Sequence, residues 1–468
     1  MTTGSKGLRT GAATRDNVAT LLVAGVSALF GVALIEATVL ISDATAAAGM
    51  AGGAVALALG TVSAVFVMLA VYVASVVTAN TFATVVAGRR TSIALLRVLG
   101  AEASRVRRAL ATEGLVMGAL GAVAGLVVGV LAAWVTASIG MAQGWLPRTG
   151  YHLLTPALAA PVLVVIATTW LAAWIGCRTV TSVTPLEATA AAAGPTAPDA
   201  HPRGRSAAAI VLLSIGGLLL AFGMLIGVVS PLGLFIAFFG GVLSFSGVIA
   251  GAGRIMPGVL ALVGRAFGRS PAARIAVANA SRYPERSTRA TLALVVGVTL
   301  ITTFAVALTS YSDVVDSLAS DEGSRQVMDD TIGVTIGVFS ALVGFSALIA
   351  AVGLVNTLTV GMLQRIRELG LLRALGFSRG QLRAMILAEG AQLTAGAIVF
   401  GLLLGTLYGW AAVQSLLGSV GRTLIVPSMP WVVLAVVVGG GILLTAVCSA
   451  IASRRAGRVS PVAALAVE

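Results

Sequence analysis

The sequence predicts an all-α polytopic membrane protein of about ten transmembrane helices, built from two copies of one unit. Hydrophobic residues make up 58% of the 468 residues, charged residues only 10%, and the mean hydropathy is +1.02. Such a composition excludes a water-soluble globular protein. The stretch from Asn80 to Ala188 also recurs without a gap from Asn356 to Ala464, at a constant offset of 276 residues (356 − 80). The repeat indicates a duplicated membrane unit.

The expected spans are apolar runs of roughly 20 residues or more, each long enough to cross a hydrocarbon core of ~30 Å. In chain order they lie near 18–42, 53–88, 113–138, 154–177, 207–229, 231–252, 290–311, 332–364, 388–416 and 429–452. The first run is too long for the core of a signal peptide, so we expect it to be retained. The second and eighth runs exceed the need of a bilayer, and we expect them to project beyond it, with tilt or a kink as the alternative.

Charge distribution predicts the topology. With the N-terminus in the cytoplasm, only Arg148, Arg325 and Arg422 of the 30 Lys and Arg residues fall in outer loops. This is the positive-inside pattern, which explains the net charge of +13 better than nucleic-acid binding does. Both termini are then cytoplasmic. The two copies are separated by an even number of crossings, so they form a parallel repeat.

The spans divide as 4+2+4. We expect a first four-helix unit at 1–189, a cytoplasmic linker at 190–206, two connecting helices with a cytoplasmic segment at 207–270, and a second four-helix unit at 271–468. Small residues at four-residue spacing in the third and ninth spans predict close helix packing. These residues are Gly121, Gly125, Gly129, Gly401, Gly405 and Gly409.

Residues for catalysis are scarce. The only histidines, His152 and His201, lie in an outer loop and the linker, and the two cysteines do not have the spacing of a metal site. The single lysine, Lys6, is in the N-terminal tail, and no phosphate-binding loop is present. We therefore expect no catalytic residue, no metal and no cofactor bound by this chain. Glu36 in the first span could serve a proton relay, but contact with interfacial water is the favoured interpretation.

The cytoplasmic segment after the eighth span is the most informative. Leu369, Leu372 and Leu375 are spaced as one helix face, and Gly376 can end that helix in a left-handed conformation. Ser378 with Gln381 then has capping-box spacing. This predicts an amphipathic helix, a tight turn and a helix that returns into the membrane. It could lie on lipid headgroups. Its recurrence in both copies favours docking on a partner with two-fold symmetry.

The motif R-x-x-E-x-G-x-L-R-A-L-G-x-S-x-x-Q from Arg365 to Gln381 resembles the signature of FtsX-like permeases, the membrane subunits of ABC transporters of the MacB/LolC type. The resemblance covers both four-span units. It implies a separate ATPase subunit, as a dimer at the cytoplasmic face, which uses the ATP and receives the cytoplasmic segment as a coupling helix. It also implies that the long second helices form a stalk. The short outer loops lack the large outer domain of many members, so a tripartite pump is disfavoured.

The resemblance also implies which residues couple the chain to the ATPase. They are Arg365, Glu368, Gly370, Arg373, Gly376, Ser378 and Gln381, with Arg89, Arg97 and Gly100 in the first copy. The first copy departs from the motif. Ser92 stands in place of Glu368, Ala94 of Gly370, Glu102 of Ser378 and Arg105 of Gln381, so we expect its docking to be weaker or altered.

We therefore expect the permease subunit of an ABC transporter in the cell membrane, in contact with membrane lipids and with no nucleic acid. It would export or extract an amphiphilic, lipid-like substrate or transmit force across the membrane. One alternative is a regulatory module that controls a cell-envelope hydrolase. Another is a secondary transporter, which would need ionisable groups within its spans.

Overall fold

The computed structural model covers residues 1–468. It describes residues 4–47, 102–144, 150–181 except 152, 203–265, 284–318, 375–421 and 424–458, together with scattered positions between 60 and 79 and the single positions 278 and 344. The long second and eighth runs therefore lie mostly outside the described residues, and their projection beyond the bilayer stays a prediction.

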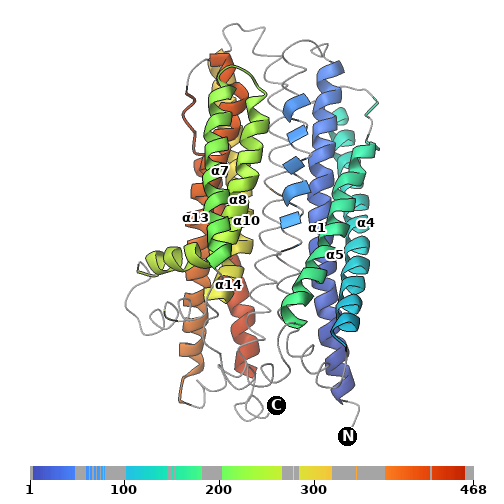
Figure 1. The fold of residues 1–468 in the computed structure, drawn as a ribbon, viewed down its shortest axis with the longest axis vertical. Helices are drawn as coiled ribbons and strands as arrows, with labels where there is room; N and C mark the ends of the chain where they lie inside the picture. Colours follow the sequence, from blue (N-terminus) through green and yellow to red (C-terminus); the bar gives the residue numbers. More distant parts are fainter. Residues whose placement is uncertain are drawn as a thin grey trace. The chain divides into compact units, whose positions relative to one another are not determined.

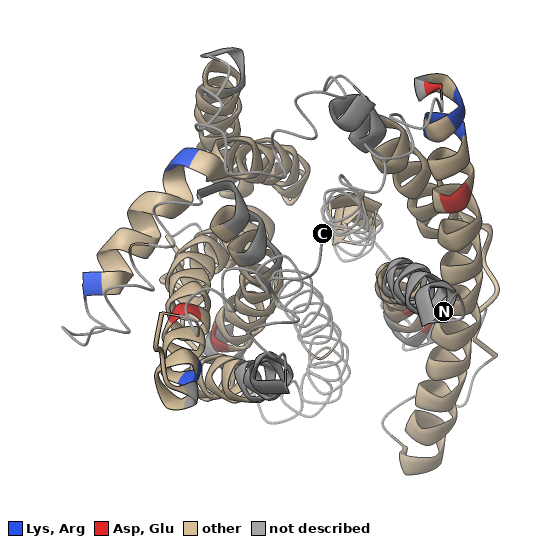
Figure 2. Cartoon of the chain, turned by 90° about the horizontal axis from the view of Figure 1, so that it is seen from below, with Lys and Arg blue, Asp and Glu red and all other residues tan. Residues whose placement is uncertain are grey.

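Every regular element of the described residues is a helix, which confirms the all-helical class. In chain order they are α1 (Gly4–Ala47), α4 (Ala103–Gln143), η1 (Pro156–Leu158), α5 (Ala159–Thr181), α7 (Arg203–Gly227), α8 (Gly233–Gly264), α10 (Pro284–Leu318), α13 (Arg379–Gly421) and α14 (Trp431–Arg458) (Figure 1). Charged side chains are sparse along these helices (Figure 2).

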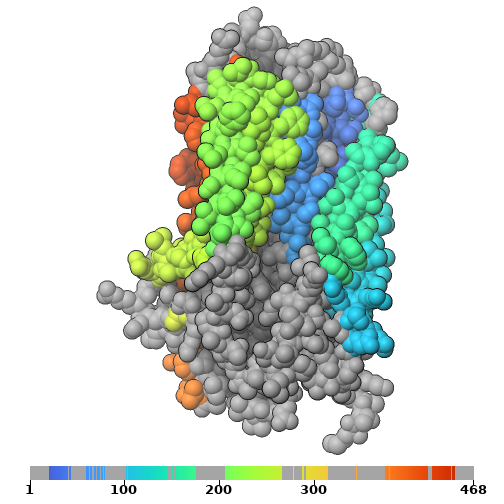
Figure 3. Space-filling view, viewed as in Figure 1, coloured from blue at the N-terminus to red at the C-terminus, as the bar shows by residue number. Residues whose placement is uncertain are grey.

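Seven of the helices in the described part are long and apolar enough to cross a membrane. Six of them carry mean hydropathies of 1.9 or more over their spans, and the span of α13 has 1.8. α7 lies on the visible face of the molecule (Figure 3). Its side chains Ile210, Leu218 and Leu225 are each at least 65% exposed, which makes water the wrong solvent for this helix. Such a face is stable against lipid tails. The molecule is thus a multi-pass membrane protein, as predicted.

The chain splits into two compact units. The described helices of the first unit are α1, α4, η1 and α5, in which α1 lies against α4 and α5. Ala24, Ala28 and Val165 form one fully buried cluster of this unit, and Val32, Ile35 and Leu158 form a second. Since α1 buries residues on all of its sides, it is the core helix of the unit.

The second unit contains α7, α8, α10, α13 and α14, so the two connecting helices belong with the second copy. α7 and α8 form a close pair, and both also contact α13. Pro257 lies inside α8, where it removes a backbone hydrogen bond and favours a kink. Beyond it, buried Leu260 packs against Leu393 of α13.

The glycines of α4 and α13 contact α1 and α10 in the same way, although α1 and α10 lie outside the gapless sequence repeat. A Cβ added at Gly125 would lie 2.9 Å from the Ala28 Cβ, and one added at its counterpart Gly401 would lie 2.8 Å from the Val298 Cβ. Gly129 and Gly405 meet Val32 and Thr302 in the same way. The α1 and α10 partners are therefore 270 residues apart (298 − 28), six fewer than the repeat offset. The helix pair is repeated, although these two helices share little sequence.

Candidate coupling site

Gly376 forms the turn that precedes α13. Its φ angle is +96°, in the left-handed region that glycine enters without steric cost. A Cβ added there would meet no heavy atom within 4 Å, so the constraint at this position is the backbone conformation and not space. The turn leaves Leu375 72% exposed. An apolar side chain is thus presented on a backbone of defined shape.

A reciprocal pair of hydrogen bonds then starts α13. The Gln381 backbone N–H donates to the Ser378 Oγ at 3.1 Å, and the Ser378 backbone N–H donates to the Gln381 Oε1 at 2.9 Å. This is the capping box, which satisfies donors that the first turn of a helix leaves free. Leu382 and Met385 follow, both at most 3% exposed, and attach this first turn to the rest of the unit. The turn is therefore rigidly connected to α13.

The first copy starts its equivalent helix without that cap. Glu102 precedes α4 in an extended conformation (φ −65°, ψ 137°), and its side chain makes no capping hydrogen bond. Its carboxylate instead accepts a hydrogen bond from the Ser104 Oγ at 3.4 Å. The substitutions noted in the sequence thus change the local chemistry, because neither a glutamate at 102 nor an arginine at 105 reproduces the Ser and Gln pair.

Near the start of α4, which has no capping hydrogen bond, Arg107 makes a contact with a residue distant in the sequence. Its guanidinium carbon lies 3.4 Å from the centroid of the Trp174 ring, a cation–π distance. Trp174 also stacks on Trp170, with ring centroids 6.4 Å apart. The repeat counterpart Arg383 is exposed, and the residue 276 positions after Trp174 is Ala450. Sequence comparison paired the two arginines but missed this difference, although a tryptophan aligned with an alanine was the available signal.

Most of the predicted coupling residues lie outside the described part of the chain. These are Arg365, Glu368, Gly370, Arg373, Arg89, Arg97 and Gly100. Gly376, Ser378 and Gln381 are the three whose geometry is described, and they lie together at the start of α13.

The six predicted packing glycines all lie where another helix approaches closely. Added Cβ atoms would lie 2.6 Å from the Leu21 carbonyl oxygen at Gly121, 2.3 Å from the Gly25 carbonyl oxygen at Gly125 and 2.8 Å from the Thr303 carbonyl oxygen at Gly409. Corresponding distances at Gly129, Gly401 and Gly405 to side-chain atoms are 2.6, 2.7 and 2.5 Å. Real Cβ atoms do not approach other atoms this closely. The packing of α1 against α4 and of α10 against α13 therefore requires glycine at these positions.

The segment 424–430 between α13 and α14 is tied to the second unit by hydrogen bonds to side chains. The Trp410 Nε1–H donates to the Ile425 carbonyl at 2.7 Å, and the Ile425 N–H donates to the Gln414 Oε1 at 2.7 Å. Thr309 and the neighbouring Ser310 on α10 hold Ser428 by two further bonds of 3.0 Å. A displacement of α10 or α13 would therefore carry this segment with it.

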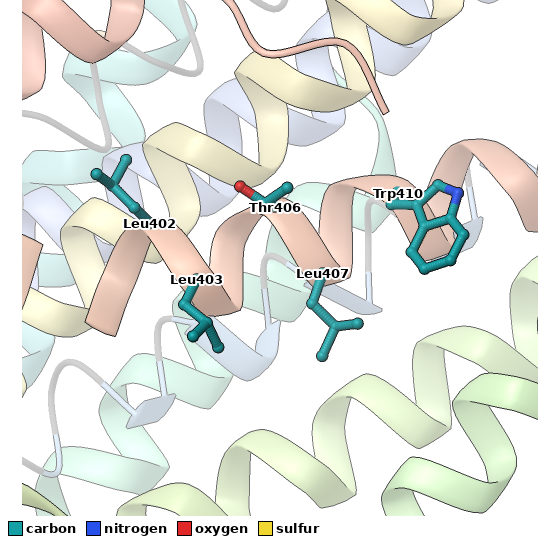
Figure 4. A pocket seen from close by; sticks show the side chains of 5 residues that line it. All are labelled: Leu402, Leu403, Thr406, Leu407 and Trp410. Carbon is teal, nitrogen blue, oxygen red and sulfur yellow. The ribbon is translucent and has the colours of Figure 1, made fainter. Parts of the chain in front are cut away.

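An apolar pocket of about 480 Å³ has one wall on α13 (Figure 4). Its described lining residues are Leu402, Leu403, Thr406, Leu407 and Trp410. The pocket is shallow and open, and its described wall offers methyl groups and an indole ring to an alkyl chain.

The position of Glu36 differs from the one expected from the sequence. Its side chain is only 2% exposed, so the expected contact with interfacial water is wrong. Both carboxyl oxygens are buried without a hydrogen-bond partner among the described residues. Sequence reasoning placed Glu36 within a span correctly but could not tell which side of the helix faces the rest of the unit.

Comparisons with known proteins agree with this organisation. The family described as FtsX-like permease C-terminal matches the chain twice, over residues 64–185 and 340–461, and the two matches start 276 residues apart (340 − 64). A protein of Bacillus subtilis (strain 168) described as the uncharacterized ABC transporter permease YknZ is 29% identical over 161 residues, which cover 31% of this chain and 38% of that relative. The chain therefore spans well under half of that relative's length. The two family matches cover more than half of the chain, so this multi-pass membrane protein belongs to the FtsX-like permease family.

Proposed function

We propose that the chain is the transmembrane subunit through which a separate ATPase dimer drives the export or extraction of an amphiphilic, lipid-like substrate. The observation that carries this proposal is the rigid turn before α13. Gly376 fixes its shape, the capping box joins it to a long membrane helix, and Leu375 is exposed on it. A partner that binds this turn would move α13 directly. In this proposal the chain binds no cofactor of its own, and the partner uses the ATP.

The two copies would then receive the ATPase dimer unequally. α13 begins with a capping box, whereas α4 begins with the Arg107–Trp174 contact and no cap. Both arrangements fix the start of a membrane helix, but they present different side chains to a partner. We expect the contact at the second copy to be the stronger of the two. This layout retains the 4+2+4 order, the parallel repeat and the cytoplasmic termini predicted from the sequence.

The substrate class rests on the apolar character of the described spans. The pocket on α13 has a wall suited to an alkyl chain, and the seven candidate spans of the described residues contain few charged groups. A lipid-like molecule would find a favourable surface there, and a small ion would not.

The test compares substitutions at Gly376 that differ in their tolerance of a left-handed backbone. Asparagine accepts that conformation and β-branched valine does not. Gly376→Val is expected to lower substrate-stimulated ATPase activity of the reconstituted complex, while Gly376→Asn retains most of it. Arg373→Glu is expected to uncouple hydrolysis as well. Equal activity of all three variants and the wild type would refute the coupling assignment.

A second candidate is mechanical transmission to a cell-envelope hydrolase. The observation in its favour is the segment around Ser428, which α10 and α13 hold by hydrogen bonds and which exposes Leu424 and Val426 by 74% and 80%. Such a segment could transmit motion of the helices to an outer partner. Ser428→Pro, which removes the backbone donor to Ser310, should then abolish hydrolase activation while transport persists. Loss of transport while hydrolase activation persists would favour substrate transport instead.

A further inference from the structure

Glu36 is the most unusual buried side chain of the first unit. It lies in the last third of the apolar span Leu21–Leu40, four residues before its end, and is 2% exposed. Neither carboxyl oxygen has a hydrogen-bond partner among the described residues. Ionisable groups within a membrane span are costly, and they are rarely left without a function. The coupling scheme above does not use this residue.

Helix geometry directs Glu36 toward α4. Gly25, Ala28 and Val32 of α1 contact the α4 glycines, and Glu36 follows Val32 by four residues, on the same helix face. The second unit supports this placement. Its equivalent of Glu36 at the α1 offset is Val306 (36 + 270), which is fully buried and faces Gly409 of α13. The first copy thus has a carboxyl group where the second copy has a valine.

No basic side chain of the same unit's spans can neutralise that carboxyl group. The four predicted spans of the first unit contain no Lys, Arg or His at all. The ionisable groups on the predicted spans of the first unit are few. Asp43 lies two turns further along α1, Tyr72 lies in the second span, and α4 from Gly114 to Gln143 has none, as does α5 up to Gly176. The described spans of α1, α4 and α5 therefore supply no basic partner for Glu36. Arg325, which belongs to the same compact unit, lies outside the described residues.

A buried carboxylate without a counter-ion is neutralised by taking up a proton. A proton also needs no cavity, whereas a larger cation would require ligands beside Glu36. We propose that Glu36 is an intramembrane proton-binding site, and that release of its proton requires α1 and α4 to separate so that water reaches the carboxylate. The step is a simple exchange: the carboxyl O–H bond breaks, the proton passes to water, and the negative charge stays on Glu36.

Proton binding at Glu36 is independent of ATPase coupling and can be tested without any partner. The full chain in nanodiscs is studied by infrared difference spectroscopy between wild type and Glu36→Gln. A protonated carboxyl group has a carbonyl band distinct from that of a carboxylate, so the band is expected at neutral pH in the wild type only. An ordinary exposed glutamate, with a pKa of about 4.3, would be ionised there. Absence of the band at neutral pH overturns the proposal.

Chemical labelling identifies which carboxyl group is protonated. N,N′-dicyclohexylcarbodiimide takes the proton of a carboxylic acid on a nitrogen and then bonds the carboxyl oxygen to its central carbon, which adds one reagent mass after rearrangement. Mass spectrometry should find this adduct on the α1 peptide, with labelling that falls as pH rises. Glu113 and Glu389 at the starts of the membrane-spanning parts of α4 and α13 serve as internal comparisons and should label far less. Labelling that is independent of pH contradicts a titrating site.

Amide hydrogen exchange tests the link to helix separation. After correction for the intrinsic rate, exchange in α1 and α4 near Glu36 and Ala133 should increase at least several-fold from neutral to alkaline pH in the wild type. Glu36→Gln cannot ionise and should remove that increase. A purely structural glutamate would give the same pH profile in both proteins, and this result would refute the coupling between proton release and opening.

Discussion

Substitution of Gly125 by alanine gives a direct test of the α1–α4 packing. The added Cβ would lie 2.3 Å from the Gly25 carbonyl oxygen and 2.9 Å from the Leu29 backbone nitrogen. Ordinary contacts begin at 3.4 Å, so the two helices must move apart by about 1.1 Å (3.4 − 2.3). The third near atom is the Ala28 Cβ, also at 2.9 Å. Two of these groups are backbone and a Cβ is fixed by the backbone, so no side-chain rotation can relieve the clash.

The expected free-energy change has two parts. Overpacking of a close interface costs about 1–3 kcal/mol, and a clash with backbone belongs at the upper end. Replacement of a helical glycine by alanine returns about 1 kcal/mol through helix propensity. Gly125→Ala should therefore destabilise the protein by about 2 kcal/mol in total.

Gly217→Ala is the matched control, because a Cβ at Gly217 meets no heavy atom within 4 Å. This variant gains propensity without a clash and should be more stable by up to about 1 kcal/mol. The assay is reversible unfolding in mixed micelles of increasing SDS content, monitored by tryptophan fluorescence. A difference of about 3 kcal/mol between the variants is expected. Identical midpoints for the two variants would show that α1 and α4 do not meet at Gly125.

Two other predictions concern the starts of α13 and α4. Ser378→Ala removes the cap and should destabilise the first turn of α13 by about 0.5–2 kcal/mol, whereas Glu102→Ala at the uncapped α4 should change stability by less than about 0.5 kcal/mol. Amide exchange of the two first turns measures this, and equal effects would contradict the asymmetry. Trp174→Leu removes the ring beneath Arg107 and should cost about 1–2 kcal/mol in the same unfolding assay, since part of that guanidinium is buried. Trp134→Leu, at a ring that is 60% exposed, is the control and should change stability far less.

Local chemistry is where the sequence was most informative. The left-handed turn at Gly376 and the capping box depend on residues within three positions of one another, so their spacing predicted the geometry that the structure has. Composition likewise predicted the membrane class, because apolar side chains must face lipid whatever their tertiary contacts are. The repeat at offset 276 was visible in the letters alone, and the family matches have the same offset.

The tertiary structure decided what depends on distant contacts. Sequence could not show that α1 pairs with α4 as α10 pairs with α13, because helix packing constrains one face of a helix and leaves the other positions free to diverge. It also could not join Arg107 to Trp174, or place Glu36 inside the unit, since both depend on how helices are rotated about their axes. The sequence by itself therefore determined the membrane class, the duplication and the turn that starts α13. Only the packing of the helices determined which side chains are buried together, because burial is a property of neighbouring surfaces and not of the chain that carries them.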